Sequence, residues 1–314
     1  MKRRNILLLA TAICFGLFIS GCKKSAESTP QSNDQQQHNQ DVANTKTESD
    51  NLNQDINTAI SPTAIGKTGS VNSFTICGGT VNTDSLSATQ PYVIITYDGS
   101  VSCGIPARTR SGQVKVQLIS GTAWHNQNAV LEVTHTNYKV TYTANNHTLL
   151  FNGHKFLTDL NGINWLTWLG GGDTLALKEY CDDMTVQFEN GKTASWNWSR
   201  VSKYWVNPLN SAIYASVNGD SINGNQTIDS WGQTRWGTNF TTYMIQPWQA
   251  NSSCGWWMPT SGQYSSSTAN FTIGVTFGTN ATGGPATTAC PSYFDLTWTI
   301  NSPSSNGSIV LPYW

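Results

Sequence analysis

Charged residues are scarce in this chain, at 11% of its 314 positions, and neither sign dominates. The 17 lysines and arginines against 18 aspartates and glutamates give a formal net charge of −1. Proteins that bind nucleic acids usually carry a clear basic excess, which this balance does not provide. A strongly acidic, solvating chain is excluded for the same reason. The composition therefore indicates a nearly neutral folded protein, for which we expect no nucleic-acid partner.

The common sequence signatures of catalytic and cofactor sites are also missing. The chain has no Cys-x-x-Cys pair for zinc or redox chemistry. It also has no Gly-x-Ser-x-Gly elbow, no phosphate-binding Walker loop and no dinucleotide fingerprint. The histidines between positions 125 and 154 do not have the spacing of a shared metal site; they are His125, His135, His147 and His154. We therefore expect no catalytic residue, no metal and no cofactor.

Carboxylates are too few to suggest a hydrolase, which needs two of them at a defined separation. The glutamates of residues 66–314 are Glu132, Glu179 and Glu189. Glu179 with Asp182 and Asp183 makes the main acidic concentration, which is either a calcium or acid–base site or a solvated turn. We favour the turn, and a glycan-active enzyme is our least favoured function.

The longest apolar run near the N-terminus, Ile6–Phe18, is too short to span a membrane and follows the basic Lys2, Arg3 and Arg4. It leads into Ile19-Ser20-Gly21-Cys22, which resembles a bacterial lipobox. The resemblance implies cleavage before Cys22 and lipid attachment to its sulfur. An ordinary secretory signal is the alternative. Lys23, instead of an aspartate, favours the outer membrane.

Three regions follow from this assignment. Residues 1–21 are expected to be a lipoprotein signal peptide, and residues 66–314 a β-rich domain. Residues 22–65 are expected to be the lipidated cysteine and a disordered tether, because the stretch 31–50 is almost entirely polar. Such a stretch buries too little apolar surface to offset the entropy lost on ordering. A short helix near Asn51–Ile60 is an open alternative.

Strand signals dominate the rest of the chain, where apolar and polar residues alternate with period two. The expected strands are Tyr92–Tyr97, Gln113–Ile119, Val130–Thr136, Tyr138–Tyr142, Met184–Phe188, Ala194–Trp198, Ala212–Val217, Phe240–Ile245, Phe271–Phe277 and Phe294–Ile300. Tight-turn signals are Asp98-Gly99, Asn152-Gly153, Asn190-Gly191, Asn218-Gly219 and Asn223-Gly224. The best helix candidate is Leu175–Cys181. The pattern predicts an all-β fold, as an antiparallel β-sandwich or an extended meander, with a β-solenoid as the alternative.

Five cysteines remain after Cys14 of the signal peptide and Cys22. An exported protein can form disulfides. We expect Cys77–Cys103 and Cys254–Cys290, each joining strands close in sequence, with Cys181 left over. Buried free thiols are the alternative, because spacing alone does not determine connectivity.

Tryptophan is the most unusual component: all 13 lie from position 124 onward. Trp196 and Trp198 are two residues apart and so point to the same face of a strand. Trp256 and Trp257 are adjacent, so that at least one would point away from the core. Such flat rings either form a large aromatic core or a platform for sugar rings.

The domain as a whole resembles a type of uncharacterised lipoprotein found in Bacteroidota. Three stretches carry the likeness, which spans about residues 108–300. They are the strand beginning Arg110-Ser111-Gly112 with its later neighbour Asn137-Tyr138-Lys139-Val140, the hairpin from Val186 to Trp196, and the ending with Cys254, Ser261-Gly262, Phe277-Gly278 and Cys290. The resemblance implies an all-β lipoprotein and no known activity. Where that family has an acidic loop, this chain has Thr279-Asn280.

Together these features predict a lipid-anchored envelope protein of the outer membrane, with a structural or binding role and no catalysis. A carbohydrate-binding module that uses exposed tryptophans is the alternative. The expected partners are the membrane, through the lipid, and glycans or outer-membrane proteins.

Overall fold

A computed structural model describes residues 30–60, 76–84, 90–123, 126–163, 173–207, 209–224, 226–255, 258–301 and 304–313. Within them lie one helix and sixteen strands. They are α1 (Pro30–Ala59), β1 (Gly79–Asn82), β2 (Tyr92–Cys103), β3 (Arg108–Ser120), β4 (Val130–Tyr142), β5 (Thr148–Asp159), β6 (Leu175–Cys181), β7 (Thr185–Phe188), β8 (Thr193–Val206), β9 (Ile213–Gly219), β10 (Ser221–Asn223), β11 (Gln226–Gln233), β12 (Asn239–Asn251), β13 (Ser261–Thr268), β14 (Phe271–Thr279), β15 (Tyr293–Asn301) and β16 (Ser304–Pro312).

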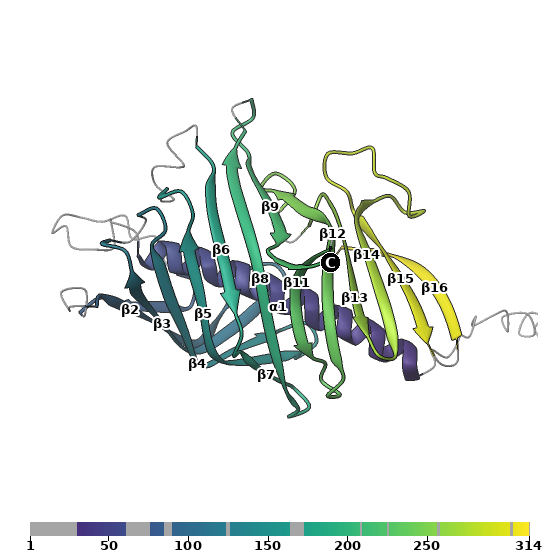
Figure 1. Ribbon diagram of the computed structural model, residues 1–314, viewed down its shortest axis with the longest axis horizontal. Helices are drawn as coiled ribbons and strands as arrows, with labels where there is room; N and C mark the ends of the chain where they lie inside the picture. Colours follow the sequence, from purple (N-terminus) through teal and green to yellow (C-terminus); the bar gives the residue numbers. More distant parts are fainter. Residues whose placement is uncertain are drawn as a thin grey trace, which may run out of the picture. The chain divides into compact units, whose positions relative to one another are not determined.

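The strands form one antiparallel sheet, so the expected all-β fold is confirmed. Along its main path the strands follow chain order, as in a meander (Figure 1), while β7, β9 and β10 pair beside that path. Each pair of strands among the described residues is antiparallel. Nearly all residues of the ten expected segments lie in strands, and the two segments Val130–Thr136 and Tyr138–Tyr142 join into β4.

The expected tight turns divide into two kinds. Asn190-Gly191 connects β7 to β8, and Asn223-Gly224 lies between β10 and β11, each with a positive φ at glycine. Asp98-Gly99 and Asn152-Gly153 instead lie inside β2 and β5, and Asn218-Gly219 ends β9. At Gly153 a Cβ would come within 2.8 Å of the Asp183 carbonyl oxygen. The glycine therefore permits close approach of two backbones, which local sequence does not reveal.

The helix expected over Leu175–Cys181 is wrong, because these residues form strand β6. β6 pairs with β5 on one side and β8 on the other. Its side chains alternate only weakly in burial, so the segment lacks the clear period-two pattern of a half-buried strand. Pairing on both sides outweighs its modest helix propensity.

The disordered tether expected over residues 22–65 is also wrong in its central part, where α1 extends from Pro30 to Ala59. The chain divides into two units, residues 1–37 and 38–314. The structure describes the first unit only from Pro30, in the opening turns of α1. From His38 onward the helix belongs to the second unit, together with the sheet.

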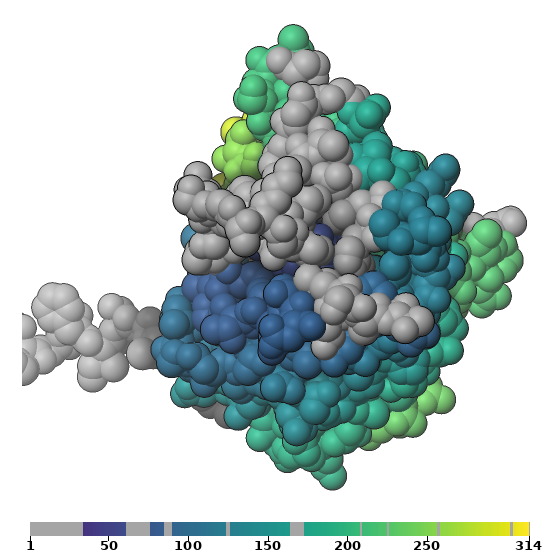
Figure 2. Space-filling view, turned by 90° about the vertical axis from the view of Figure 1, so that its left-hand side faces the viewer, coloured from purple at the N-terminus to yellow at the C-terminus, as the bar shows by residue number. Residues whose placement is uncertain are grey.

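From His38 to Ile60 the helix has no exposed residue. It crosses one face of the sheet: His38 contacts Ser266 of β13, and Asp55 contacts Tyr97 of β2. The purple helix is seen passing behind the strands in Figure 1. Figure 2 looks from the β2 and β3 side, with the blue and teal surface of the first strands toward the viewer. The helix is thus a central element of the second unit, lined by strands from β2 to β14.

The apolar core lies between this helix segment and the inner face of the sheet. Val42, Leu52, Ile56, Ala59 and Ile60 are the apolar residues that the helix buries there. Five apolar side chains in 23 residues make a weak hydrophobic face, so the rest of the contact is polar. In the described part of the chain, no helix combines the length and the apolar character that crossing a membrane requires.

Candidate functional site: a buried polar interface

The inner face of the sheet carries an unusual number of charged side chains. All four arginines of residues 66–314 are buried, with exposed fractions of 6% or less. Buried charges are costly unless they are paired, and here the counter-charges come largely from the helix. We call this contact the buried polar interface. Its charged members are Asp41, Lys46, Glu48, Asp50 and Asp55 of α1, and Arg108, Arg110, Lys155, Glu179, Arg200, Asp229 and Arg235 of the sheet and its turns, with the exposed Glu189 at its margin.

Glu179 is at the centre of the interface. Strand alternation turns it inward from β6, and it is 3% exposed. Its carboxylate pairs with Lys155 of β5 at 3.2 Å and accepts a hydrogen bond from the Trp198 indole of β8. From the helix, Ser49 and Asn53 also donate to it, Asn53 at 2.7 Å. Two strands and two turns of helix therefore converge on a single carboxylate.

The charge states at this centre follow from its contacts. Burial alone would raise the pKa of Glu179, but the positive charges of Lys155 and Arg200 and the hydrogen bonds from the helix lower it to about 2. Burial lowers the pKa of Lys155. The ammonium also donates to Ser49 at 2.9 Å and to Asn53 at 2.8 Å. The pair is therefore satisfied on both sides, which is the condition under which buried ions persist.

Next to it lies a second group of four charges. Lys46 of the helix pairs with Asp229 of β11 at 3.0 Å. Arg200 of β8 lies between Asp229, at 3.7 Å, and Asp50 of the helix, at 3.9 Å. The longer separations leave Asp50 the less well compensated of the two carboxylates. Burial is the main reason that its pKa is raised to about 6.

This raised pKa predicts a specific pH dependence for Asp50→Asn. A carboxyl whose folded pKa lies above its unfolded value of 3.8 contributes stability below pH 4, and loses it as pH rises through 6. The asparagine variant has no such loss. Its stability relative to the wild type should therefore increase between pH 4 and pH 7 by up to about 3 kcal/mol. Urea unfolding at several pH values measures this, and the exposed Asp173→Asn is the control. A pH-independent difference would contradict the assignment.

A third group lies toward β2 and β3. Glu48 pairs with Arg108 at 2.8 Å and accepts a hydrogen bond from the Tyr138 hydroxyl of β4. About two turns further along the helix, Asp55 pairs with Arg110 at 2.6 Å. Burial raises the pKa of Tyr138 well above its ordinary value, and the adjacent Glu48 raises it further. The phenol is thus a stable hydrogen-bond donor.

The fourth group lies toward the start of the enclosed helix segment. Asp41 accepts two hydrogen bonds from the Arg235 guanidinium, at 2.8 and 2.6 Å. Arg235 lies in the turn between β11 and β12, and it also contacts Glu189 in the turn after β7. His147 lies 3.0 Å from Glu189. Each of the four groups therefore joins α1 to strands or turns far away in sequence.

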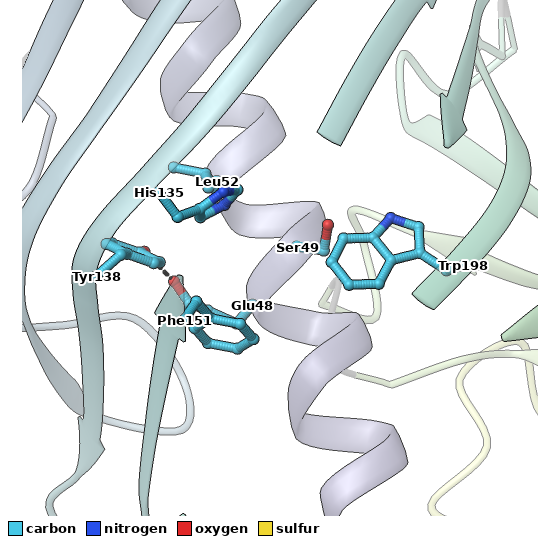
Figure 3. Close-up of a pocket in the computed structure, with 7 residues that line it drawn as sticks. All are labelled: Glu48, Ser49, Leu52, His135, Tyr138, Phe151 and Trp198. Carbon is cyan, nitrogen blue, oxygen red and sulfur yellow. Dashed lines mark hydrogen bonds between the residues drawn. The ribbon is translucent and has the colours of Figure 1, made fainter. Parts of the chain in front are cut away.

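A small cavity remains beside this interface, and Figure 3 shows its lining. Its volume is about 10 Å³, which is about the space of one water molecule. It is lined by Glu48, Ser49, Leu52, His135, Tyr138, Phe151 and Trp198. The helix itself thus fills the groove that the sheet forms. With α1 in place, the cavity beside this interface is too small for an organic ligand.

The disulfides expected from the sequence are both present. Cys77 is bonded to Cys103 and Cys254 to Cys290, with Cα–Cα distances of 6.1 and 5.2 Å. Cys181 is left over, as expected, and it is buried. Burial raises the pKa of its thiol to about 12, so that it packs as a small hydrophobic group.

The expected ligand platform at Trp196 and Trp198 is wrong. The two rings point to one face, as the spacing predicted, but that face is the interior, where they are 1% and 2% exposed. Trp198 donates to Glu179, and Trp196 packs on Phe240. Trp256 and Trp257 lie outside the described residues, as does Cys22. Carbohydrate binding through that second pair stays a prediction.

The acidic concentration around position 180 does not form one site. Glu179 points inward, whereas Asp182 and Asp183 are exposed in the following turn. Asp183 pairs with His154 at 2.6 Å. The ligand atoms of His154, Asp182 and Asp183 lie within 4.8 Å of one another. The solvated turn that we favoured describes Asp182 and Asp183, but it is wrong for Glu179, which is buried on β6. Glu132 lies on β4, with its side chain half-buried.

Comparisons with protein-family models, with curated proteins and with solved structures find no match for this chain. No similar protein therefore indicates a role for the buried polar interface. Sequence inspection missed it because the charges of α1 follow no motif. The one available signal is that Arg108 and Arg110 of β3 and Arg200 of β8 lie inside strands.

Proposed function

We propose that this protein is a lipid-anchored envelope protein with a structural or binding role at the outer membrane. The observation that carries the proposal is the position of α1. Residues 23–29 alone separate Cys22 from the start of the helix at Pro30. Seven extended residues span at most about 25 Å. A lipid on Cys22 would therefore hold the start of the helix close to the membrane surface.

The buried polar interface would allow the domain to bear a force that is transmitted from the lipid anchor. From Asp41 to Asp55, three groups of ion pairs and one group of hydrogen bonds, the one around Glu179, hold the helix against the strands. A force transmitted from the lipid would thus act on a helix embedded in the domain. Glu179 and Glu189, which a hydrolase could use, are engaged with Lys155 and Arg235 instead. This supports a role in structure or binding more than one in catalysis.

Replacing Cys22 by alanine tests the anchor. We expect incorporation of a labelled fatty acid to disappear, because the thiol that accepts the lipid is gone, and the protein to leave the membrane fraction. Cys14→Ala, inside the apolar signal segment, is the matched control and should keep both properties. Labelling that survives in the Cys22 variant would overturn the proposal.

A further inference from the structure

The last strand, β16, leaves one edge of the sheet open. It pairs with β15 along its whole length, from Asn301 opposite Ser304 to Tyr293 opposite Pro312, with no shift in register. On its other side no described strand pairs with it, and it is the yellow strand that ends the sheet in Figure 1. Every second residue of an antiparallel strand turns its backbone N–H and C=O away from its neighbour, so about half of the residues of β16 present groups that no described strand satisfies.

This edge lacks the features that usually prevent pairing with another chain. Natural edge strands are protected by charged side chains, by bulges or by being very short. β16 has the sequence Ser-Ser-Asn-Gly-Ser-Ile-Val-Leu-Pro, without a charge, and proline occurs only at its end. The opposite edge differs, because β1 covers only four residues, Gly79–Asn82. The two edges are therefore unequal in length.

An incompletely covered apolar strip runs beside the open edge on the inner face. Phe294 and Trp298 of β15 and Leu311 of β16 are only partly buried where they adjoin the core. Ile309, opposite the buried Leu296, is 42% exposed. Trp298 lies over Gly307, whose missing side chain makes room for the ring. Apolar surface next to an open edge is typical of a sheet that continues into another subunit.

We infer that β16 pairs in antiparallel orientation with β16 of a second copy of this chain. Two uncharged strands can lie side by side without like-charge repulsion. A two-fold axis would bring the two apolar strips together and close the assembly. Pairing of β16 with β1 of another copy would leave most of β16 unmatched, which disfavours an open chain of copies. The inference is independent of the lipid anchor.

Cysteine cross-linking of the full chain in its membrane tests this dimer. Single cysteines at Ser304, Ser305, Asn306 and Ser308 should give a disulfide-linked species at twice the mass of the monomer after mild oxidation. The yield should peak at one position, where the two-fold axis passes. Ser195→Cys, exposed on β8, is the matched control and should give little product. The unmodified chain reports any background from Cys181.

A second variant distinguishes pairing of the two β16 strands from random collision of the introduced cysteines. Ser308→Lys should lower the mass measured by light scattering in detergent from dimer to monomer, because position 308 is the middle of β16 and the lysines of the two copies would lie close together. The variant should still fold into the same sheet, with an unchanged circular dichroism spectrum, since position 308 is exposed. A monomeric mass for the unmodified chain, equal cross-linking at Ser195, or a cross-linked band containing a different protein would each overturn the inference.

Discussion

Replacing Glu179 by glutamine will lower the free energy of unfolding by about 3–5 kcal/mol. Glutamine keeps the size of the side chain but removes its charge. Lys155, which is 0% exposed, would then be a buried ammonium without its counter-ion. The acceptors for Trp198 and for the helix residue Asn53 would be weakened at the same time. Urea unfolding followed by tryptophan fluorescence measures the loss, and an unchanged slope with denaturant shows that only stability has altered.

Glu132→Gln is the matched control for this substitution. Glu132 also lies in a strand, but it is half-buried and points away from the helix-facing side. A change outside a buried network is usually worth less than about 0.5 kcal/mol. Equal losses in the two variants would show that the network around Glu179 is not what holds α1. The double variant Lys155→Met with Glu179→Leu should recover only part of the stability, because it removes both buried charges but leaves Ser49, Asn53 and Trp198 without their acceptor.

Removing residues 30–60 will abolish the cooperative unfolding transition of the domain. Without the helix, Arg108, Arg110 and Arg200 would lose Glu48, Asp55 and Asp50 as counter-charges. Trp196 and Trp198 would face water instead of the core. We expect a red-shifted tryptophan emission and loss of the near-ultraviolet circular dichroism signal, with strand content that melts gradually.

A synthetic peptide of residues 30–60, added to the shortened chain, should restore the native emission. The matched peptide has Glu48→Gln, Asp50→Asn and Asp55→Asn, and it should fail at the same concentration. This difference would show that charge complementarity, and not helix formation alone, selects the helix. A shortened chain that folds cooperatively without any peptide would contradict the enclosed position of α1.

Local patterns predicted much of the sheet. Alternation placed Tyr92–Tyr97 in β2 and Phe271–Phe277 in β14, because period two arises directly from the geometry of a strand with one buried face. The same rule correctly put Trp196 and Trp198 on one face. It did not tell which face, since a large ring fits either a core or an open surface.

The enclosed position of α1 could not be predicted from local sequence patterns. Residues 38–60 are polar enough to be read as a solvated segment, and nothing nearby in sequence compensates their charges. Asp41 meets Arg235, which lies 194 positions away, and Lys46 meets Asp229, 183 positions away. A polar helix becomes a central element only when the partners of its charges are brought to it by the strands.

The sequence by itself predicted nine of the sixteen strands and both disulfide pairings, and its N-terminal segment predicts a lipid anchor. These depend on local periodicity and on chemistry at single residues. The tertiary structure alone decided that α1 is enclosed, that Glu179 is an ion-pair centre and that β16 is an open edge. The physical reason is that the free energy of a buried charge depends on its partner, and pairing across the sheet chooses that partner.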